Sequence, residues 1–581
     1  MKLITNYWKP LLSLLFGVAV MVFWRGMYPS ALAYHEQFQL FLWDDEYLIS
    51  RISQPGGLAR YMGEFLVQFY NLVTVGALIL AVLYVLVQGI TWYLCRKHEV
   101  HNNHAWYALS FIPSLLLWMI MGDENVMMSF VVAYVLQLVL LLFVPKGKKA
   151  RWIFALLAIP TSYWCLGPIV FMLVLYLAAY EFIHNSSRWQ TVCVALAEIL
   201  LALASVLISA NIVSYPLSQL FYGIDYYRIA GIFLYLLLVL EVVTVALPLG
   251  VRIFPNFEGK RVAWINIISA VALGMIAFVL KPMMYDSKKY DLIEYDYLSR
   301  LERWDAIISK SEKNMPDLPM SVSITNLALG MTNQLGDRVF DFYQNGGEGL
   351  LPRFERNSFT SLSASDIYYH LGMTNTAQRF AFEAQEGIPN FNKSARIMKR
   401  LAETNLINGQ YGVALKYLQI LDKTLFYKKW AERMMSLVAD KKEINNHPEY
   451  GYLRQCHLQK DFLYSEAEVD KILGLLFVQN NANKLAMQYM AVYPLLEKNL
   501  QKLMLYLPFI ENKILYNPRA IQEGVAMACM QQHQQPPQGF IDQITEQRFR
   551  EFAQVFANQG KNSPQLDSFK NTYWYYMLVT K

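Results

Sequence analysis

The chain has 581 residues, of which 55% are hydrophobic and 14% aromatic, and this composition is typical of a membrane protein with several spans rather than a soluble one. Its net charge of +6 is modest, and its basic residues gather in short loops between apolar stretches, so we expect no nucleic-acid partner. The five cysteines lack CxxC or zinc-ligand spacing, which argues against a disulfide framework and a zinc site. Without a phosphate-loop motif or a Gly-x-Ser-x-Gly motif, nucleotide-driven chemistry and serine hydrolysis have no support.

The first 285 residues contain nine apolar stretches that are candidates to cross about 30 Å of hydrocarbon. They fall at residues 8–28, 65–94, 106–121, 126–144, 152–165, 167–183, 190–212, 229–251 and 262–280. The first is longer than the apolar core of a signal peptide, so we expect an uncleaved helix. Pro160, Gly167 and Pro168 interrupt the fifth and sixth stretches, which form either a tight hairpin or one broken element. The expected count is therefore about nine spans.

The distribution of basic residues predicts the orientation. Lysines and arginines predominate in the loops that lie on the same side of the predicted membrane as the N-terminus, as in the run from Lys146 to Arg151. We expect the protein in a bacterial inner membrane. The positive-inside rule then places its N-terminus in the cytoplasm and everything after Lys281 in the periplasm. Arg25 lies at the outer end of the first span, where we expect it either to reach a lipid phosphate or to extend to the headgroups.

The first outer loop, residues 30–64, is the most unusual segment of the membrane part. Three consecutive acids lie in it, Asp44, Asp45 and Glu46, followed by Arg51 and Arg60. A carboxylate on this face suits glycosyl transfer, which needs a base for the acceptor hydroxyl and a cation or metal for the leaving phosphate. The acids are candidates for the base or for ligands of a divalent cation, and the arginines for phosphate ligands. The alternative is the polar face of an interfacial helix.

Three further polar features bear on function. Asp123 and Glu124 form a second acidic pair, in the tight turn between the third and fourth spans, and we expect it to support the first outer loop. His35, beside the first outer loop, is a candidate base, but we expect it to be a surface histidine. Glu198 and Glu241 fall at matched depth within the seventh and eighth spans, where charges are costly. They predict either a proton relay in a transporter or two protonated, hydrogen-bonded side chains.

After residue 285 the composition becomes soluble, charged and helical, with an internal period. Gly372 and Gly409 are 37 positions apart, as are Ala377 and Ala414, and small residues at such positions allow two antiparallel helices to cross closely. The pattern resembles tetratricopeptide-like repeats, which stack into a solenoid with a concave binding surface. We therefore expect two parts, a transmembrane domain at 1–285 and an all-α repeat domain at 286–581.

This order of elements resembles the GT-C superfamily of membrane glycosyltransferases, which use polyprenyl-phosphate sugars and place an essential acid in the first outer loop. The local pattern of Asp44-Asp45, Gly57, Tyr61 and Gly63-Glu64-Phe65 is similar to an Asp-Asp…Gly-Arg-Phe arrangement in some bacterial members. Glu64 stands where those members have arginine, and Arg60 would have to substitute for it. Nearly the whole chain also resembles an uncharacterised family of Bacteroidota membrane proteins, through runs such as NLALGMTNQLGDRVF and RLAETNLINGQYGVALKYL.

The sequence thus predicts an all-α membrane protein that transfers a sugar from a polyprenyl-phosphate donor. Its acceptor, a protein or a glycan, would be held by the repeat domain. Two alternatives remain open. One is a membrane scaffold whose repeats recruit a periplasmic partner, and the other is a proton-coupled transporter that uses Glu198 and Glu241.

Overall fold

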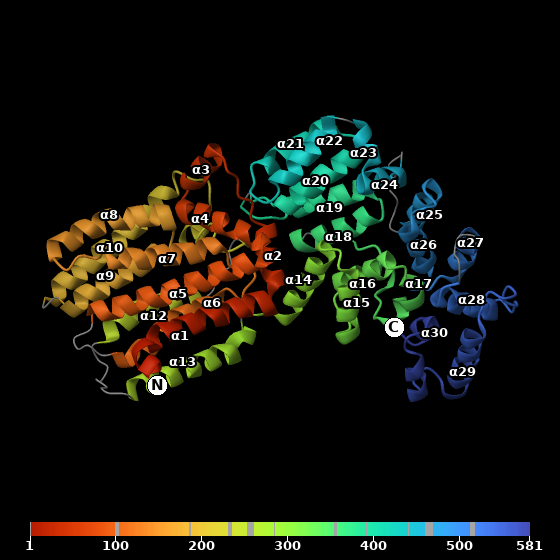
Figure 1. Ribbon diagram of the computed structural model, residues 1–581, viewed down its shortest axis with the longest axis horizontal. Helices are drawn as coiled ribbons and strands as arrows, with labels where there is room; N and C mark the ends of the chain where they lie inside the picture. Colours follow the sequence, from red (N-terminus) through yellow and green to blue (C-terminus); the bar gives the residue numbers. More distant parts are fainter. Residues whose placement is uncertain are drawn as a thin grey trace. The chain divides into compact units, whose positions relative to one another are not determined.

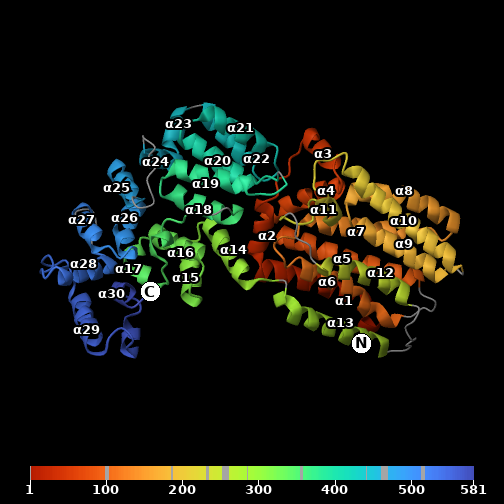
Figure 2. The same cartoon turned by 180° about the vertical axis from the view of Figure 1, so that it is seen from behind.

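The computed structural model describes an all-helical protein (Figures 1 and 2). The described residues are 2–98, 104–184, 187–229, 235–251, 261–283, 285–353, 357–390, 392–439, 441–458, 469–511 and 517–580. They divide into two compact units. Unit 1 comprises residues 1–290 together with two later segments, 388–395 and 422–428, and unit 2 comprises residues 291–387, 396–421 and 429–581.

Unit 1 has a helix in each of the nine predicted apolar stretches. These helices are α1 (Lys2–Val22) continued by the π-helical turn η1 (Phe23–Met27), α5 (Val73–His98), η3 (His104–Phe111) with α6 (Ile112–Ile120), α7 (Met128–Leu142), α8 (Lys148–Leu166), α9 (Val170–His184), α10 (Arg188–Ser209), α12 (Tyr235–Gly250) and α13 (Arg261–Leu280). Many of them run roughly parallel to one another (Figure 1). Most of them face one core that includes Tyr84, Tyr134 and Tyr176, all fully buried. A second, smaller cluster joins α1, η3, α6 and α13 through residues such as Trp8, Phe111 and Ala263.

Among the described residues, four helices are long and apolar enough to cross a membrane: Tyr7–Met27, Val73–His98, Arg188–Ser209 and Val262–Leu280. Several of the others, such as α7 and α9, are apolar but have only 15 residues. The count of nine spans therefore remains a prediction. The second span begins at Val73 rather than at residue 65, because the preceding residues belong to two separate elements, α4 (Gly57–Val67) and η2 (Gln68–Asn71).

The fifth and sixth stretches are two separate helices, α8 and α9, which meet at Gly167. This residue has a φ of +90°, a conformation that residues with a Cβ rarely adopt. The turn at Gly56, with a φ of +79°, packs on it: a Cβ at Gly56 would lie 3.6 Å from the Gly167 Cα. The Gly56 N–H also donates to the Trp164 carbonyl at 2.9 Å. The tip of the first outer loop is thereby attached to the end of α8.

In unit 2, helices α18 (Ser358–His370) and α19 (Thr374–Glu386) pack on each other, and α20 (Ala395–Ile407) and α21 (Tyr411–Asp422) lie at the corresponding positions 37 residues later. Gly372 and Gly409 occupy the two turns with φ of +85° and +74°, while Ala377 and Ala414 are fully buried. The sequence period therefore matches the spacing of these four helices, and a repeat solenoid remains a prediction.

A buried charge network joins three helices of unit 2. Arg396 of α20 donates to Asp296 of α14 (Ser287–Arg300) at 2.7 Å and to Asp366 of α18 at 2.5 Å. Arg400 also donates to Asp366, at 2.8 Å. Burial raises the pKa of Asp366, but the two arginines outweigh it and lower the pKa to about 2. Both carboxylates thus have charged partners within unit 2.

Candidate functional site

The first outer loop is a chain of short elements. Helix α2 (Pro29–Gln37) is followed by a segment without regular secondary structure, residues 38–44, and then by α3 (Asp45–Ile52) and α4. Asp45 and Glu46 lie in the first turn of α3, where carboxylates interact favourably with the helix dipole. A glycine is required at position 57, because a Cβ there would lie 2.0 Å from the Arg51 carbonyl oxygen. The local sequence therefore accounts for the path of this loop.

The three acids of the loop have different surroundings. The Asp44 carboxylate accepts a hydrogen bond from Lys423 Nζ at 2.9 Å, whereas Asp45 and Glu46 are exposed. Among the residues that the structure describes, no group of three or more His, Cys, Asp or Glu side chains is placed to hold a metal ion. A divalent cation on Asp44, Asp45 and Glu46 thus has no support from their arrangement.

The two arginines of the loop meet at Glu64, a residue of α4. Arg51 Nε donates to Glu64 Oε2 at 2.9 Å, and Arg60 Nε donates to Oε1 at 3.1 Å. The Tyr47 hydroxyl also donates to Glu64 Oε2, at 2.5 Å. From sequence, Glu64 is only a departure from the GT-C pattern. In the structure it is the shared counter-ion of both predicted phosphate ligands.

The remaining nitrogens of Arg60 also have acceptors. Nη1 lies 2.8 Å from Asp225 Oδ2 and 3.2 Å from Gln54 Oε1, and Nη2 donates to Asn392 Oδ1 at 2.7 Å. Burial lowers the pKa of Arg60, but the Asp225 and Glu64 carboxylates outweigh it and raise the pKa above the usual range. Each guanidinium nitrogen of Arg60 therefore already has an acceptor within unit 1.

Two segments from the second half of the chain complete unit 1 around this loop. The Leu40 N–H donates to the Lys393 carbonyl at 3.0 Å, and the Trp43 N–H donates to the Lys423 carbonyl at 2.9 Å. These bonds give partners to two backbone N–H groups of the segment 38–44, which has no helix or sheet of its own to supply them. The sequence gives no sign of these contacts.

The second acidic pair, Asp123 and Glu124, lies in a turn in which both carboxylates have hydrogen-bonding partners. The Asp123 carboxylate accepts from the Asn125 backbone N–H at 2.8 Å, and Glu124 is paired with Lys289 at 2.6 Å. Burial raises the pKa of Asp123. Among the described residues, no hydrogen bond or ion pair joins this turn to Asp44 or Asp45. The structure therefore gives each acidic segment its own partners.

Arg228 is a buried cation beside this turn. Its backbone N–H donates to the Asn125 carbonyl at 2.7 Å, and its guanidinium lies over the rings of Tyr34 and Phe38 at 4.3 and 4.5 Å. The side chain is 6% exposed, and within the described part of the chain none of its three guanidinium nitrogens has a hydrogen-bond acceptor. A buried cation without an acceptor is costly, so this position favours an anion. The sequence shows Arg228 only as one more basic residue of an outer loop.

His35 of α2 is buried near Arg228. It is 2% exposed, and neither ring nitrogen has a hydrogen-bond partner among the described residues. Burial, and then the charge of Arg228, lower its pKa to about 3. The prediction of a surface histidine was wrong, because α2 packs into unit 1 instead of lying on its surface.

The other predicted residues lie apart from the loop. Arg25 is exposed within η1. Glu198 of α10 is buried and interacts electrostatically with a buried ion pair of 2.6 Å, Arg151–Glu181, which sequence reasoning missed. Glu241 of α12 instead interacts with tyrosines of other elements. Glu198 and Glu241 therefore have different neighbours.

Comparisons with known proteins give a family but no activity. No curated protein and no solved structure is significantly similar to the chain. Residues 4–580 match the family described as "Family of unknown function (DUF6057)". Since this match covers nearly the whole chain, the protein belongs to the DUF6057 family.

Proposed function

We propose that this protein is a membrane glycosyltransferase of the GT-C type, which transfers a sugar from a polyprenyl-phosphate donor to an acceptor outside the cytoplasm. The observation that carries the proposal is the Arg228 guanidinium, which is buried next to the acidic turn with no hydrogen-bond acceptor among the described residues. An anion would compensate this charge. In a protein with long apolar helices, the phosphate of a lipid-linked donor is an anion that could arrive there.

The same proposal assigns the base. Asp45 is exposed at the start of α3 and can receive a proton from an acceptor hydroxyl, whereas Asp44 is paired with Lys423. The acceptor oxygen then attacks the anomeric carbon of the donor sugar, and the bond from that carbon to the phosphate oxygen breaks. The lipid phosphate leaves with the electron pair, the configuration inverts, and Arg228 stabilises the leaving charge. In this assignment Arg228 replaces Arg51 and Arg60, whose donors meet Glu64.

The finer topology belongs to the proposal as well. About nine spans, a cytoplasmic N-terminus and a periplasmic repeat domain would place the first outer loop and the acceptor on the same side of the inner membrane. The paired helices of unit 2 support a role for this unit in holding a protein or glycan acceptor.

The test separates binding from chemistry. Full-length protein purified in detergent is titrated with farnesyl phosphate, and binding is measured by native mass spectrometry. We expect Arg228→Gln to weaken binding at least tenfold and Arg303→Gln, a matched change at an exposed arginine of unit 2, to leave it unchanged. Equal binding by both variants would contradict the role of Arg228.

Chemistry is tested in cells. Asp45→Asn, at a normal protein level in the membrane, should abolish a surface glycan that the wild-type protein restores, whereas the neighbouring exposed change Glu46→Gln should leave the glycan intact. An unchanged glycan profile in the Asp45→Asn cells would contradict the assignment of the base.

A second candidate is a membrane scaffold. It is favoured by the ion pairs that already occupy Asp44, Glu124, Arg51 and Arg60, because charges paired within the protein need no substrate to explain them. In that case Arg228→Gln would not change binding of farnesyl phosphate and Asp45→Asn would not change the surface glycan. Exposed substitutions on unit 2 would instead abolish recruitment of a partner protein.

A further inference from the structure

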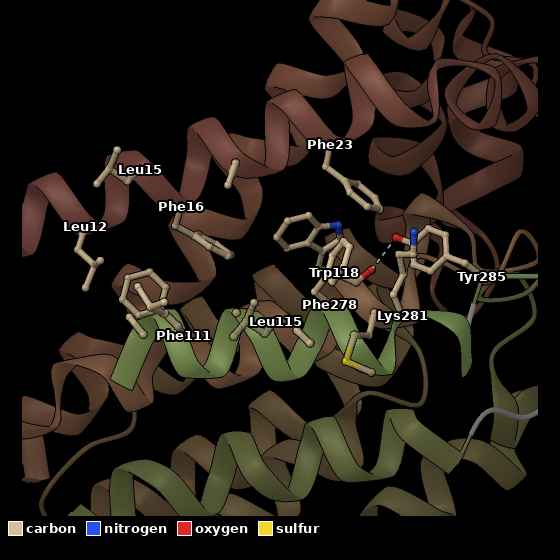
Figure 3. Close-up of a pocket in the computed structure, with 16 residues that line it drawn as sticks. Leu12, Leu15, Phe16, Phe23, Phe111, Leu115, Trp118, Phe278, Lys281 and Tyr285 are labelled. Atoms are coloured by element: carbon tan, nitrogen blue, oxygen red, sulfur yellow. Dashed lines mark hydrogen bonds between the residues drawn. The ribbon is translucent and has the colours of Figure 1, made fainter. Parts of the chain in front are cut away.

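An apolar cavity lies in unit 1 between α1, α6 and α13 (Figure 3). Its volume is about 330 Å³, within the range of roughly 300–1,000 Å³ that is usual for small-molecule sites. Leu12 and Phe111 lie toward one end and Phe23 and Tyr285 toward the other, as Figure 3 shows. Its lining is almost entirely hydrocarbon and aromatic, which suits an apolar chain rather than a polar metabolite.

The walls of this cavity are held by aromatic contacts. The Trp118 ring packs edge-on against Phe23, with centroids 5.0 Å apart, and against Phe16 at 6.0 Å. The Tyr285 hydroxyl donates to the Trp118 carbonyl at 3.3 Å (Figure 3). These contacts fix the α1 and α6 sides, so the cavity does not depend on one loosely packed side chain.

One position in the α13 wall shows that the cavity has room. A Cβ added at Gly274 would meet no atom within 4 Å. The neighbouring side chains of Val271 and Met275 are 54% and 60% exposed. Since α1 and α13 are both long and apolar enough to cross a membrane, a cavity between them would open toward lipid.

The end of the cavity near Tyr285 carries a positive charge. Lys281 Nζ donates to the Tyr28 hydroxyl at 3.0 Å and lies 5.6 Å from the Phe278 ring centroid and 6.0 Å from that of Tyr285. No carboxylate of the described residues forms an ion pair with it. Lysine at the end of a span, flanked by tyrosines, is typical of the depth of lipid headgroups. An apolar cavity that ends in such a cation is complementary to an anionic lipid.

We propose that this cavity binds one anionic membrane phospholipid, with an acyl chain along α1, α6 and α13 and the headgroup phosphate on Lys281. The site is separate from Arg228 and does not depend on the glycosyltransferase assignment. It would hold α13, the last apolar helix of unit 1, against α1 and α6 through a lipid that becomes part of the folded protein.

The test uses the full chain, purified in a mild detergent and mixed with equal amounts of phosphatidylglycerol and phosphatidylcholine. Native mass spectrometry counts the lipids that stay bound. The wild-type protein should retain one phosphatidylglycerol, with at least a fivefold preference over phosphatidylcholine. Lys281→Gln should bring that preference close to one, because it removes the charge while the apolar cavity remains. Equal retention of both lipids by the wild-type protein would overturn the proposal.

The cavity itself is tested with a matched pair of glycines. Gly274→Leu should fill the cavity and reduce retention of phosphatidylglycerol at least fivefold. Gly89→Leu, in α5, is the control, since a Cβ there also meets nothing within 4 Å but the residue lies outside the cavity. Equal losses in the two variants would overturn the site. Displacement of phosphatidylglycerol by farnesyl phosphate in the wild-type protein would also overturn it, by assigning the cavity to the sugar donor.

Discussion

Arg60 donates a hydrogen bond from Nη2 to Oδ1 of Asn392, 2.7 Å away, although 332 positions separate the two residues in the chain. Both side chains are buried in unit 1. A segment that lies among the helices of unit 2 in sequence therefore belongs to unit 1 in space. Through this contact, the Arg60 guanidinium holds the segment around Asn392 against the first outer loop.

Removal of Asn392 should release its segment. We expect Asn392→Ala to destabilise unit 1 by about 1.5–3 kcal/mol, the usual range for a hydrogen bond to a charged group. Limited proteolysis should then cut within residues 388–395 several times faster than in the wild-type protein. Asn314→Ala, at an exposed position, serves as the control. Unchanged cleavage would mean that the backbone hydrogen bonds of this segment are enough to hold it in unit 1.

Glu64 should be among the most sensitive positions of the first outer loop. Glu64→Gln leaves Arg51 and Arg60 without their shared counter-ion, and loss of one partner of a buried ion pair costs about 3–5 kcal/mol. The melting temperature in detergent should fall by several degrees. The exposed change Glu46→Gln should leave it within one degree or so, given that most surface substitutions alter stability by under about 0.5 kcal/mol. Similar melting temperatures for the two variants would contradict the importance of the Glu64 network.

Asp44 offers a way to separate stability from chemistry. Its pair with Lys423 is solvent-accessible, since the two side chains are 25% and 47% exposed, and such pairs contribute about 0–1 kcal/mol. Asp44→Asn should therefore barely change the melting temperature. A strong loss of a surface glycan in this variant would indicate a direct chemical role for Asp44. A drop of many degrees would instead show that the pair with Lys423 is structural.

Acidification should destabilise unit 1 through His35. Its folded-state pKa of about 3 lies below the ordinary value of 6.5, so the unfolded chain binds a proton that the folded chain does not. Stability is then full above about pH 6.5 and falls as the pH is lowered toward 3, by up to about 1.4 kcal/mol per pH unit. His35→Leu should flatten the dependence of the melting temperature between pH 7 and pH 5. His533→Gln, at an exposed histidine of unit 2, is the control. A His35→Leu profile parallel to the wild type would contradict this origin.

Two glycines of unit 2 should respond in opposite directions to the same change. Gly372 has a φ of +85°, and a Cβ there would lie 2.8 Å from the Cys456 Cβ, so Gly372→Ala should cost about 1–2 kcal/mol or more. Gly412 lies in α21 with nothing within 4 Å of an added Cβ, and Gly412→Ala should gain about 0.5–1 kcal/mol. Thermal unfolding of the full chain measures both, and equal shifts would show that the Gly372 turn is not under strain.

Much of the local structure follows from the sequence alone. Hydrophobic runs mark the helices of unit 1, and the spacing of Gly372 and Gly409 marks the helical pairs of unit 2. The Pro55-Gly56-Gly57 turn is encoded by its own residues as well. These features depend on neighbours a few positions apart, so a single sequence contains the information that specifies them.

The partners of the charged side chains were decided by tertiary structure. From the sequence, Arg60 is predicted to bind phosphate and Glu64 only departs from the GT-C pattern. In the structure, packing brings the two side chains together with Asp225 and Asn392. It also leaves Arg228 buried, with no acceptor for its guanidinium in the part of the chain that the structure describes. A charge interacts with whatever the fold places within a few ångströms, and that depends on segments far apart in the chain. The sequence by itself therefore determined the helices, and only their packing determined which charges are paired and which one favours an anion.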